Sequence, residues 1–288
     1  MRTRLPIVQN LLVPWCKGQS KKGVEGGCFL LADTQRKKIN GGFHEVLNHQ
    51  HDDNDNEKQD YMSRLHKQTA ISLERYQKTV VIGGDHSISA ATVPAFFDRY
   101  RDRGYLLWVD AHPDIQLPKT SPSGNSHGMP VSVILGNIQT SFPRKYIPYA
   151  NQISYLGIRD IDPDESLRIK HLEQTQGLQC FYGPDLLDFG ADWPRLVTRK
   201  LDHMFKIHNY EAVYVSFDVD VLDDITGTGT PFSGGISGRD LSIFFNSLST
   251  ISNVVGMDIV EFNPELCQDT ETGILEAKQI INIASNLL

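Results

Sequence analysis

Short apolar runs rich in β-branched and aromatic side chains recur along the chain, and polar or glycine-containing segments separate them. Their length and composition are typical of buried β-strands. We expect strands at residues 5–13, 79–83, 105–109, 153–157, 178–182, 212–217 and 254–259.

Longer amphipathic segments lie between these runs, and their apolar side chains repeat with the period of a helix. We expect helices at residues 58–77, 87–103, 164–176, 193–208, 238–250 and 272–287. Alternating strands and helices indicate βαβ units around a mainly parallel sheet. The absence of an internal repeat or linker favours a single α/β domain over residues 1–288, with three αβα layers.

One segment departs from this alternation. Residues 44–60, HEVLNHQHDDNDNEKQD, concentrate histidine, aspartate and asparagine. A solvated loop leading into a helix is favoured over a metal site there, because the pattern implies no ligand geometry.

Composition narrows the class of protein. The 288 residues are 40% hydrophobic and 22% charged, as expected for a soluble globular chain. The net charge of −7, without a Lys/Arg run longer than two residues, argues against nucleic acid and anionic lipid as partners. No apolar run approaches the length of a membrane span, so no membrane association is expected.

The cysteines and the N-terminus bear on the cellular compartment. Four cysteines lie far apart without a C-x-x-C pair, which favours a reducing cytoplasm over a disulfide framework or a thiolate zinc site. The first residues superficially resemble a signal peptide. Gln9, Asn10 and Pro14 interrupt the apolar region, however, so a first strand is the better interpretation.

Acids and histidines follow three of the predicted strands directly. In an open parallel sheet, functional groups gather beyond the carboxyl ends of the strands. The motifs VIGGDHS, VDAHPD and SFDVD place six potential metal ligands there: His86, Asp110, His112, Asp114, Asp218 and Asp220.

The spacing of these residues favours a shared site. Side chains at positions i and i+2 of an extended segment point the same way. Clustered carboxylates repel one another unless a cation neutralises them. Each motif alone also fits an ordinary turn, but together they predict a dinuclear centre. Oxygen-rich ligation with two imidazoles suits Mn(II), with iron, cobalt and nickel left open, and the expected chemistry is hydrolysis.

The same motifs carry a family resemblance. GGDHS (83–87), DAHPD (110–114) and SFDVDVLD (216–223) resemble the signature of the arginase/agmatinase (ureohydrolase) superfamily. KGQSKKGVEGG (17–27), GIRDIDPDE (157–165) and GMDIVEFNPE (256–265) are similar to further arginase segments. The loop SPSGNSHGMPVS (121–132) is similar to the arginase substrate loop and points to arginase within the superfamily.

The resemblance implies an arginase-like fold, two Mn(II) ions and hydrolysis of L-arginine to L-ornithine and urea. One ion would be held by His86, Asp110, Asp114 and Asp218, and the other by Asp110, His112, Asp218 and Asp220. Asp114 would orient the attacking hydroxide, Glu261 would stabilise the tetrahedral intermediate together with the metals, and His127 would shuttle protons.

The resemblance also implies contacts with the amino-acid end of the substrate. Ser123 and Asn125 match residues that bind the α-carboxylate, Asp162 matches the carboxylate facing the α-ammonium, and Glu165 would support that contact. Gln116 and Ser121 occupy positions where arginases usually have Asn and Thr.

Other departures concern the metal loop, the N-terminal motif and assembly. Asp224 replaces a Pro in a loop about two residues shorter than the family's, and Cys28 replaces a Pro. A homo-oligomer, trimer or hexamer, is expected from the family. The sequence ends at Leu288 without the tail that links subunits in some arginases, so weaker assembly is expected. Agmatine, guanidinobutyrate or formiminoglutamate as substrate, and a catalytically silent scaffold, remain alternatives.

Overall fold

A single eight-stranded sheet forms the centre of the protein. The computed structural model describes residues 8–36, 43–46 and 55–287. The strands are β1 (Val8–Val13), β2 (Phe43–Val46), β3 (Lys78–Gly83), β4 (Gly104–Val109), β5 (Ile153–Leu156), β6 (Gln179–Phe181), β7 (Ala212–Asp218) and β8 (Val254–Val260). They are ordered β2-β1-β3-β8-β7-β4-β5-β6, and every neighbouring pair is parallel.

The apolar runs predicted these strands well, with one omission at the edge of the sheet. All seven predicted runs contain a strand, although residues 5–7 of the first lie outside the described residues. The prediction of a loop from residue 44 is wrong for residues 44–46, which belong to β2. Residues 47–54 lie outside the described part of the chain, and α2 begins at Asp55. Four residues with alternating polar character are too few to give a strand signal.

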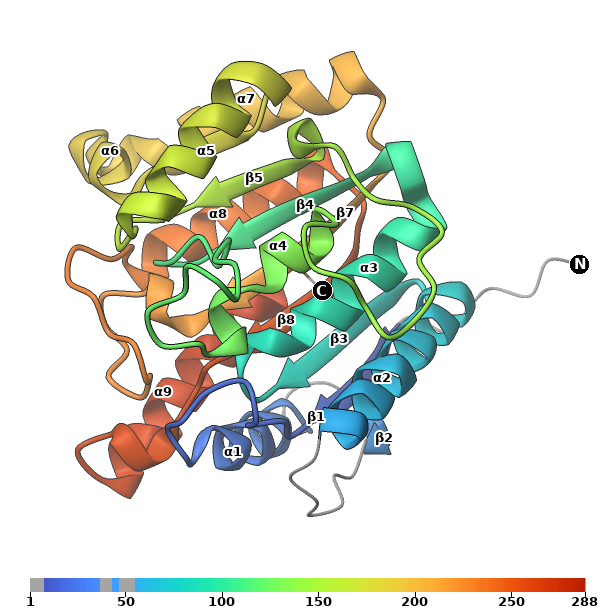
Figure 1. Ribbon diagram of the computed structural model, residues 1–288. Helices are drawn as coiled ribbons and strands as arrows, with labels where there is room; N and C mark the ends of the chain where they lie inside the picture. Colours follow the sequence, from blue (N-terminus) through green and yellow to red (C-terminus); the bar gives the residue numbers. More distant parts are fainter. Residues whose placement is uncertain (1–7, 37–42, 47–54, 288) are drawn as a thin grey trace, which may run out of the picture.

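Helices cover both faces of the sheet (Figure 1). They are α1 (Val24–Arg36), α2 (Asp55–Arg75), α3 (Ser89–Tyr100), α4 (Pro130–Ile134), α5 (Pro163–Gln176), α6 (Gly183–Asp188), α7 (Trp193–His208), α8 (Gly238–Ile251) and α9 (Thr270–Ala284). Helices α2 to α5 pack on one face, and α1 and α6 to α9 pack on the other. The predicted three-layer αβα arrangement with a parallel sheet is therefore confirmed.

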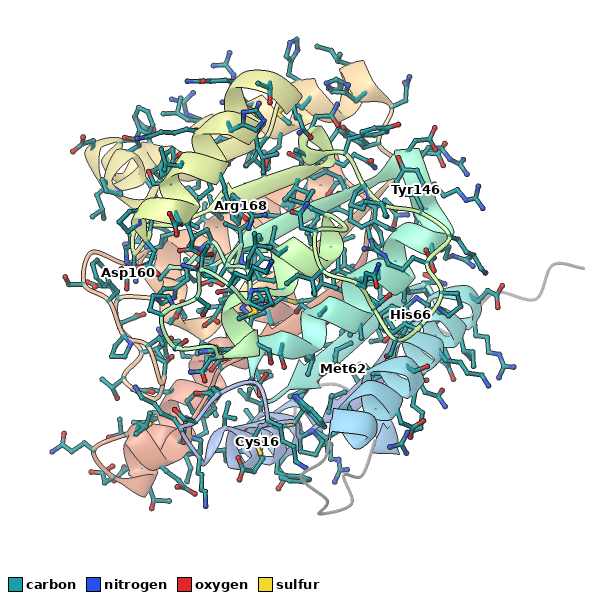
Figure 2. All side chains as sticks on the ribbon, in the orientation of Figure 1. Cys16, Met62, His66, Tyr146, Asp160 and Arg168 are labelled. Atoms are coloured by element: carbon teal, nitrogen blue, oxygen red, sulfur yellow. The ribbon has the colours of Figure 1, made fainter. Side chains whose placement is uncertain are left out.

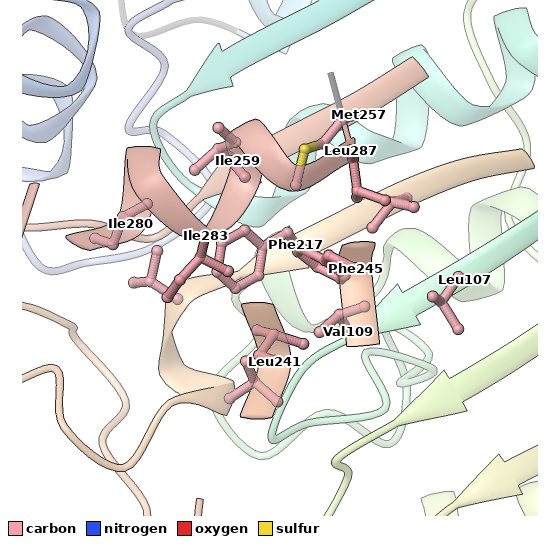
Figure 3. Close-up of a cluster of buried hydrophobic side chains, with 14 of the residues drawn as sticks. Leu107, Val109, Phe217, Leu241, Phe245, Met257, Ile259, Ile280, Ile283 and Leu287 are labelled. Atoms are coloured by element: carbon pink, nitrogen blue, oxygen red, sulfur yellow. The ribbon is translucent and has the colours of Figure 1, made fainter. Parts of the chain in front are cut away.

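The larger apolar layer lies between the central strands and helices α8 and α9 (Figure 3). Phe217 of β7 meets Phe245 of α8 edge-to-face, with ring centroids 5.7 Å apart. Ile259 of β8 and Ile280 of α9 are also fully buried there. Since full burial of one such side chain stabilises the fold by about 1.5–3 kcal/mol, this layer anchors the strands that carry the polar residues.

Helix α1, which the hydrophobic pattern did not predict, packs unusually close to the chain after β8. A Cβ atom at Gly27 would lie 1.7 Å from the carbonyl oxygen of Phe262, so only glycine fits. Adjacent glycines weaken a helical pattern, which explains the omission. Cys28, which replaces the family's proline, is buried inside this helix and its Sγ donates to the carbonyl of Ile82 at 3.0 Å.

The strand order places the polar motifs beside one another. Strands β3, β8, β7 and β4 are consecutive neighbours, and all point toward the same edge. Figure 2 labels Asp160 on this side of the molecule, and His66 and Tyr146 on the opposite side. Among the described residues, none of the helices combines the length and apolar character needed to cross a bilayer.

Candidate metal centre

His86 lies at the centre of the first group of ligands. It follows β3 in a short 3-10 turn and is 1% exposed. Its Nδ1 lies 3.1 Å from a carboxylate oxygen of each of three aspartates: Asp110, Asp114 and Asp218. Strands β3, β4 and β7 thus bring one nitrogen and three oxygens together.

A second group surrounds His112. Its Nδ1 lies 2.9 Å from Asp220 Oδ2 and 3.5 Å from Asp110 Oδ1. Asp110 therefore faces both histidines, with one oxygen toward each. Asp218 joins the first group through Oδ2, whereas its Oδ1 accepts a hydrogen bond from the Asp220 backbone N–H at 2.8 Å.

These residues fit a pair of divalent cations. Nδ1 of His86 is buried without a hydrogen bond, because none of the three oxygens around it satisfies hydrogen-bond geometry. Burial and the charge of Asp110 raise the pKa of Asp114 to about 6, and burial with the charges of Asp220 and Asp110 raises that of Asp218 well above its usual range. A cation among these groups would provide the missing countercharge and accept the nitrogen lone pair.

Local backbone conformation contributes to the arrangement. Asp114 and Glu261 have φ values of 47° and 66°, in the left-handed region that non-glycine residues rarely adopt. Both side chains point into the site. Such strain persists where the surrounding structure enforces it, and it is typical of functional residues.

Glu261, which follows β8, connects the first metal group to His127. Its Oε1 accepts the His86 backbone N–H at 2.8 Å and lies 3.0 Å from His127 Nδ1. Its Oε2 accepts the Gln19 amide at 2.6 Å. Burial would lower the pKa of His127, but the hydrogen bond and charge of Glu261 outweigh burial and raise the pKa to about 9. His127 is therefore held protonated beside the metal group at neutral pH.

The residues expected at the amino-acid end separate into two sets. Gln116 donates to Asp162 at 2.7 Å, and Glu165 accepts the Asp162 and Ile115 backbone N–H groups at 3.2 and 3.3 Å. These side chains join the end of β4 to the start of α5. Glu165 is buried, which raises its pKa to about 8.

Ser121, Ser123 and Asn125 lie on the loop leading to His127. The Ser121 hydroxyl accepts the Gly124 N–H at 3.1 Å, and the Ser123 hydroxyl accepts the Asn125 N–H at 3.2 Å. Their hydroxyls thus shape the loop itself, and Ser123 is exposed. The structure places all three in the same loop as His127 without joining them to Asp162 by any hydrogen bond among the described residues.

The shortened metal loop is held by Arg159. The guanidinium donates to the carbonyl oxygens of Asp220 and Phe232 at 2.8 and 2.7 Å, and to that of Ser233 at 3.2 Å. One side chain therefore joins the two ends of the loop. Asp224, at the position of the family's proline, accepts a hydrogen bond from Gln279 of α9 at 2.6 Å.

Several contacts were not predicted from the sequence. Gln19 binds Glu261, Ser216 lies 2.9 Å from His86 Nε2, and Thr230 donates to Asp220 at 2.9 Å. The ring of Trp108 stacks on His86 with centroids 4.2 Å apart. Most of these residues lie inside the recognised motifs, but most of their partners are many residues distant, so spacing alone gives no signal.

Comparison with known proteins places this geometry in a family context. The model of the arginase family matches residues 14–285. The arginase of Eremothecium gossypii is 31% identical over 286 residues, covering 89% of this chain and 69% of the relative. The structure is similar to that of Entamoeba histolytica arginase in complex with L-ornithine, with a TM-score of 0.84, 28% identity and 99% of each chain covered. Bacillus subtilis arginase gives a TM-score of 0.82 at 26% identity, with 98% of each chain covered.

Proposed function

Because the chain belongs to the arginase family and is a hydrolase of guanidino C–N bonds, we propose that it converts L-arginine to L-ornithine and urea with two Mn(II) ions. The observation that carries this proposal is the meeting of two histidines and four aspartates at adjacent strand ends. The unsatisfied Nδ1 of His86 lies at its centre.

The donor set defines the expected cofactor. His86, Asp110, Asp114 and Asp218 would hold one ion, and Asp110, His112, Asp218 and Asp220 the other. Bound there, two divalent ions supply a water that is deprotonated near neutral pH. Oxygen-rich ligation with two imidazoles and no thiolate favours Mn(II).

The protein's own residues then orient groups and move protons. Asp114 borders the first group and is suited to orient the nucleophile through its carboxylate. Glu261 faces the same space and offers negative charge to a guanidinium. His127, protonated beside Glu261, is placed to donate the proton that the leaving amine requires.

The substrate's amino-acid end is assigned to the Gln116–Asp162–Glu165 cluster and the 121–125 loop. Asp162 is exposed and carries the negative charge that an α-ammonium needs. Ser121, Ser123 and Asn125 offer polar groups to an α-carboxylate. L-Ornithine in the complex of the Entamoeba relative carries both groups, which supports arginine as the substrate here.

One observation favours a second candidate. The Gln116 amide already binds Asp162, so an α-ammonium would share that carboxylate with Gln116. A guanidino compound without an α-ammonium, such as agmatine or guanidinobutyrate, would not compete for it. Formiminoglutamate belongs to the same superfamily alternative.

A substrate panel tests these proposals. Mn(II)-loaded protein should release urea from L-arginine with a kcat/KM exceeding that for agmatine by about ten- to a hundredfold per lost charged contact. A reversed preference would establish the second candidate. Absence of amidine hydrolysis across the panel, with both ions bound, would instead indicate a silent member.

Assembly and compartment are part of the proposal. We propose a homo-oligomer in the cytoplasm, a trimer or hexamer as in the family. Sedimentation velocity on the Mn(II)-loaded protein measures the first, and localisation of the tagged protein in its native cell measures the second.

A further inference from the structure

A buried polar chain leads away from the metal centre on the side of His86. Its Nε2 lies 2.9 Å from Ser216 Oγ, and Ser216 Oγ lies 3.1 Å from Ser89 Oγ. Ser89 then donates to Asp258 Oδ2 at 2.8 Å. Asp258 belongs to β8, Ser216 to β7 and Ser89 to the first turn of α3, and all of them are completely buried.

We propose that Asp258 is a positioning residue for the metal ligand His86, acting through Ser89 and Ser216. This inference rests on the proposed function, because it assumes that His86 binds a metal through Nδ1. Asp258 itself touches neither ligands nor substrate and would act only through the hydroxyl chain.

The direction of each hydrogen bond follows from the acceptor at the end of the chain. An ionised carboxylate only accepts, so Ser89 donates its single hydroxyl proton to Asp258. Ser89 must then accept from Ser216, which uses the only proton of Ser216. Ser216 can therefore only accept from His86 Nε2–H.

This order determines which imidazole nitrogen carries the lone pair. With the proton held on Nε2, the neutral ring presents an unprotonated Nδ1 toward the three aspartate oxygens. A metal ligand needs this tautomer, and the partner of the other ring nitrogen normally selects it. Asp258 fulfils that selecting role from two hydroxyl groups away.

The surroundings of Asp258 support more than a packing role. Its carboxylate accepts from Thr92 at 2.7 Å and from Tyr214 at 2.5 Å, in addition to Ser89. Within the described residues it forms no ion pair with Lys, Arg or His, so its buried charge has no direct countercharge. Burying such a charge costs stability, and the chain links it to the site where cations would bind.

Thr92 supplies a matched control for Ser89. Both hydroxyls come from α3, both are fully buried, and both donate to the same oxygen of Asp258. Only Ser89 continues toward His86. Ser89→Ala therefore interrupts the chain, whereas Thr92→Val removes an equivalent donor and leaves the chain intact.

The test measures Mn(II) affinity by calorimetric titration of the metal-free full-length protein. Ser89→Ala should weaken one of the two Mn(II) sites by about 10- to 100-fold, the usual effect of removing such a supporting partner. Thr92→Val should leave both affinities at the wild-type value. Thermal unfolding in EDTA should show similar losses of stability for the two variants, because each removes one buried hydrogen bond.

A third variant tests the carboxylate itself. Asp258→Asn removes the charge and allows the amide to donate toward Ser89, which would reverse the chain and favour the Nδ1–H tautomer of His86. We expect weaker Mn(II) binding, and in the metal-free ¹⁵N-histidine spectrum a change in the Nε2–H signal of His86 that Thr92→Val does not cause.

Two results would overturn the inference: equal effects of Ser89→Ala and Thr92→Val on Mn(II) affinity, or no effect of either Ser89→Ala or Asp258→Asn. Both are independent of the substrate. Failure of the proposed function would appear separately, as wild-type protein that does not bind two Mn(II) ions or does not hydrolyse any guanidino compound.

Discussion

The two halves of the metal centre differ in how their histidines are supported. His86 is 1% exposed, stacks on Trp108 and reaches Asp258 through buried hydroxyls. The side chain of His112 is 22% exposed, and its Nε2 lies 3.3 Å from Asp160, which is 47% exposed. The ligand atoms are alike, but one half depends on a rigid interior and the other on a solvated partner.

This difference teaches which physical property governs each half. Buried hydrogen bonds act at low dielectric and are little affected by salt, whereas an exposed carboxylate is screened and free to move. The His86 half should therefore set the geometry of the centre. The His112 half should exchange its ion more readily and respond to solution conditions.

The largest effect is expected where the two halves meet. Asp110 faces both histidines, so Asp110→Asn removes charge from both sites. Loss of several kcal/mol of metal-dependent stabilisation lowers kcat/KM by about a thousandfold or more. Urea release and bound manganese measure this change.

Asp202→Asn is the matched control, because it removes a carboxylate from an i,i+4 pair with the exposed Lys206. It should leave activity and metal content unchanged. Full manganese occupancy and near-normal turnover in Asp110→Asn would contradict the bridging role.

The pair formed by Glu261 and His127 gives the next largest effect, in the buried half. A histidine with a pKa raised to about 9 stabilises the folded state fully below its unfolded pKa near 6.5, and this contribution disappears as the pH rises through 9. Glu261→Gln should therefore cost metal-free protein up to about 3 kcal/mol at pH 6 and much less at pH 10.

Chemical denaturation in EDTA at the two pH values measures this difference. The imidazole signals of His127 provide the control, since their titration should move to lower pH in Glu261→Gln. A stability difference that is independent of pH, with an unmoved titration, would show that Glu261 does not hold the proton on His127.

A smaller effect is expected in the open half. Asp160→Asn should weaken one Mn(II) site by about tenfold, the lower end of the range for supporting residues, because water can replace the exposed carboxylate. Calorimetric titration beside Ser89→Ala compares the two halves directly. Asp164→Asn, an exposed carboxylate in the first turn of α5, is the control. A larger loss in Asp160→Asn than in Ser89→Ala would reverse the comparison.

The smallest effect concerns salt. Raising NaCl from about 0.05 to about 0.5 M should weaken the His112-side Mn(II) site by no more than about threefold, through screening of Asp160, and leave the other site nearly unchanged. Titrations at both ionic strengths measure it. In Asp160→Asn the salt dependence should disappear, and its persistence would place its origin elsewhere.

Much of the architecture and of the site was predictable because the relevant signals are local. Strands β3, β4, β7 and β8 are continuous apolar runs, and ligands such as Asp110 and Asp218 follow them directly. The elements that escaped prediction have weak local patterns. Strand β2 has four residues, α4 and α6 have five and six, and α1 contains the glycine pair required by its contact with Phe262.

The sequence by itself determined the strands, their parallel arrangement and the residue types at their ends, because alternation and i, i+2 spacing are properties of the local chain. Only the tertiary structure decided which distant groups support them. Gln19 meets Glu261 across 242 positions, and Ser89 meets Asp258 across 169. Such pairings depend on strand order and helix packing, which arise from the burial of the whole apolar surface and leave no trace in the spacing of the polar residues.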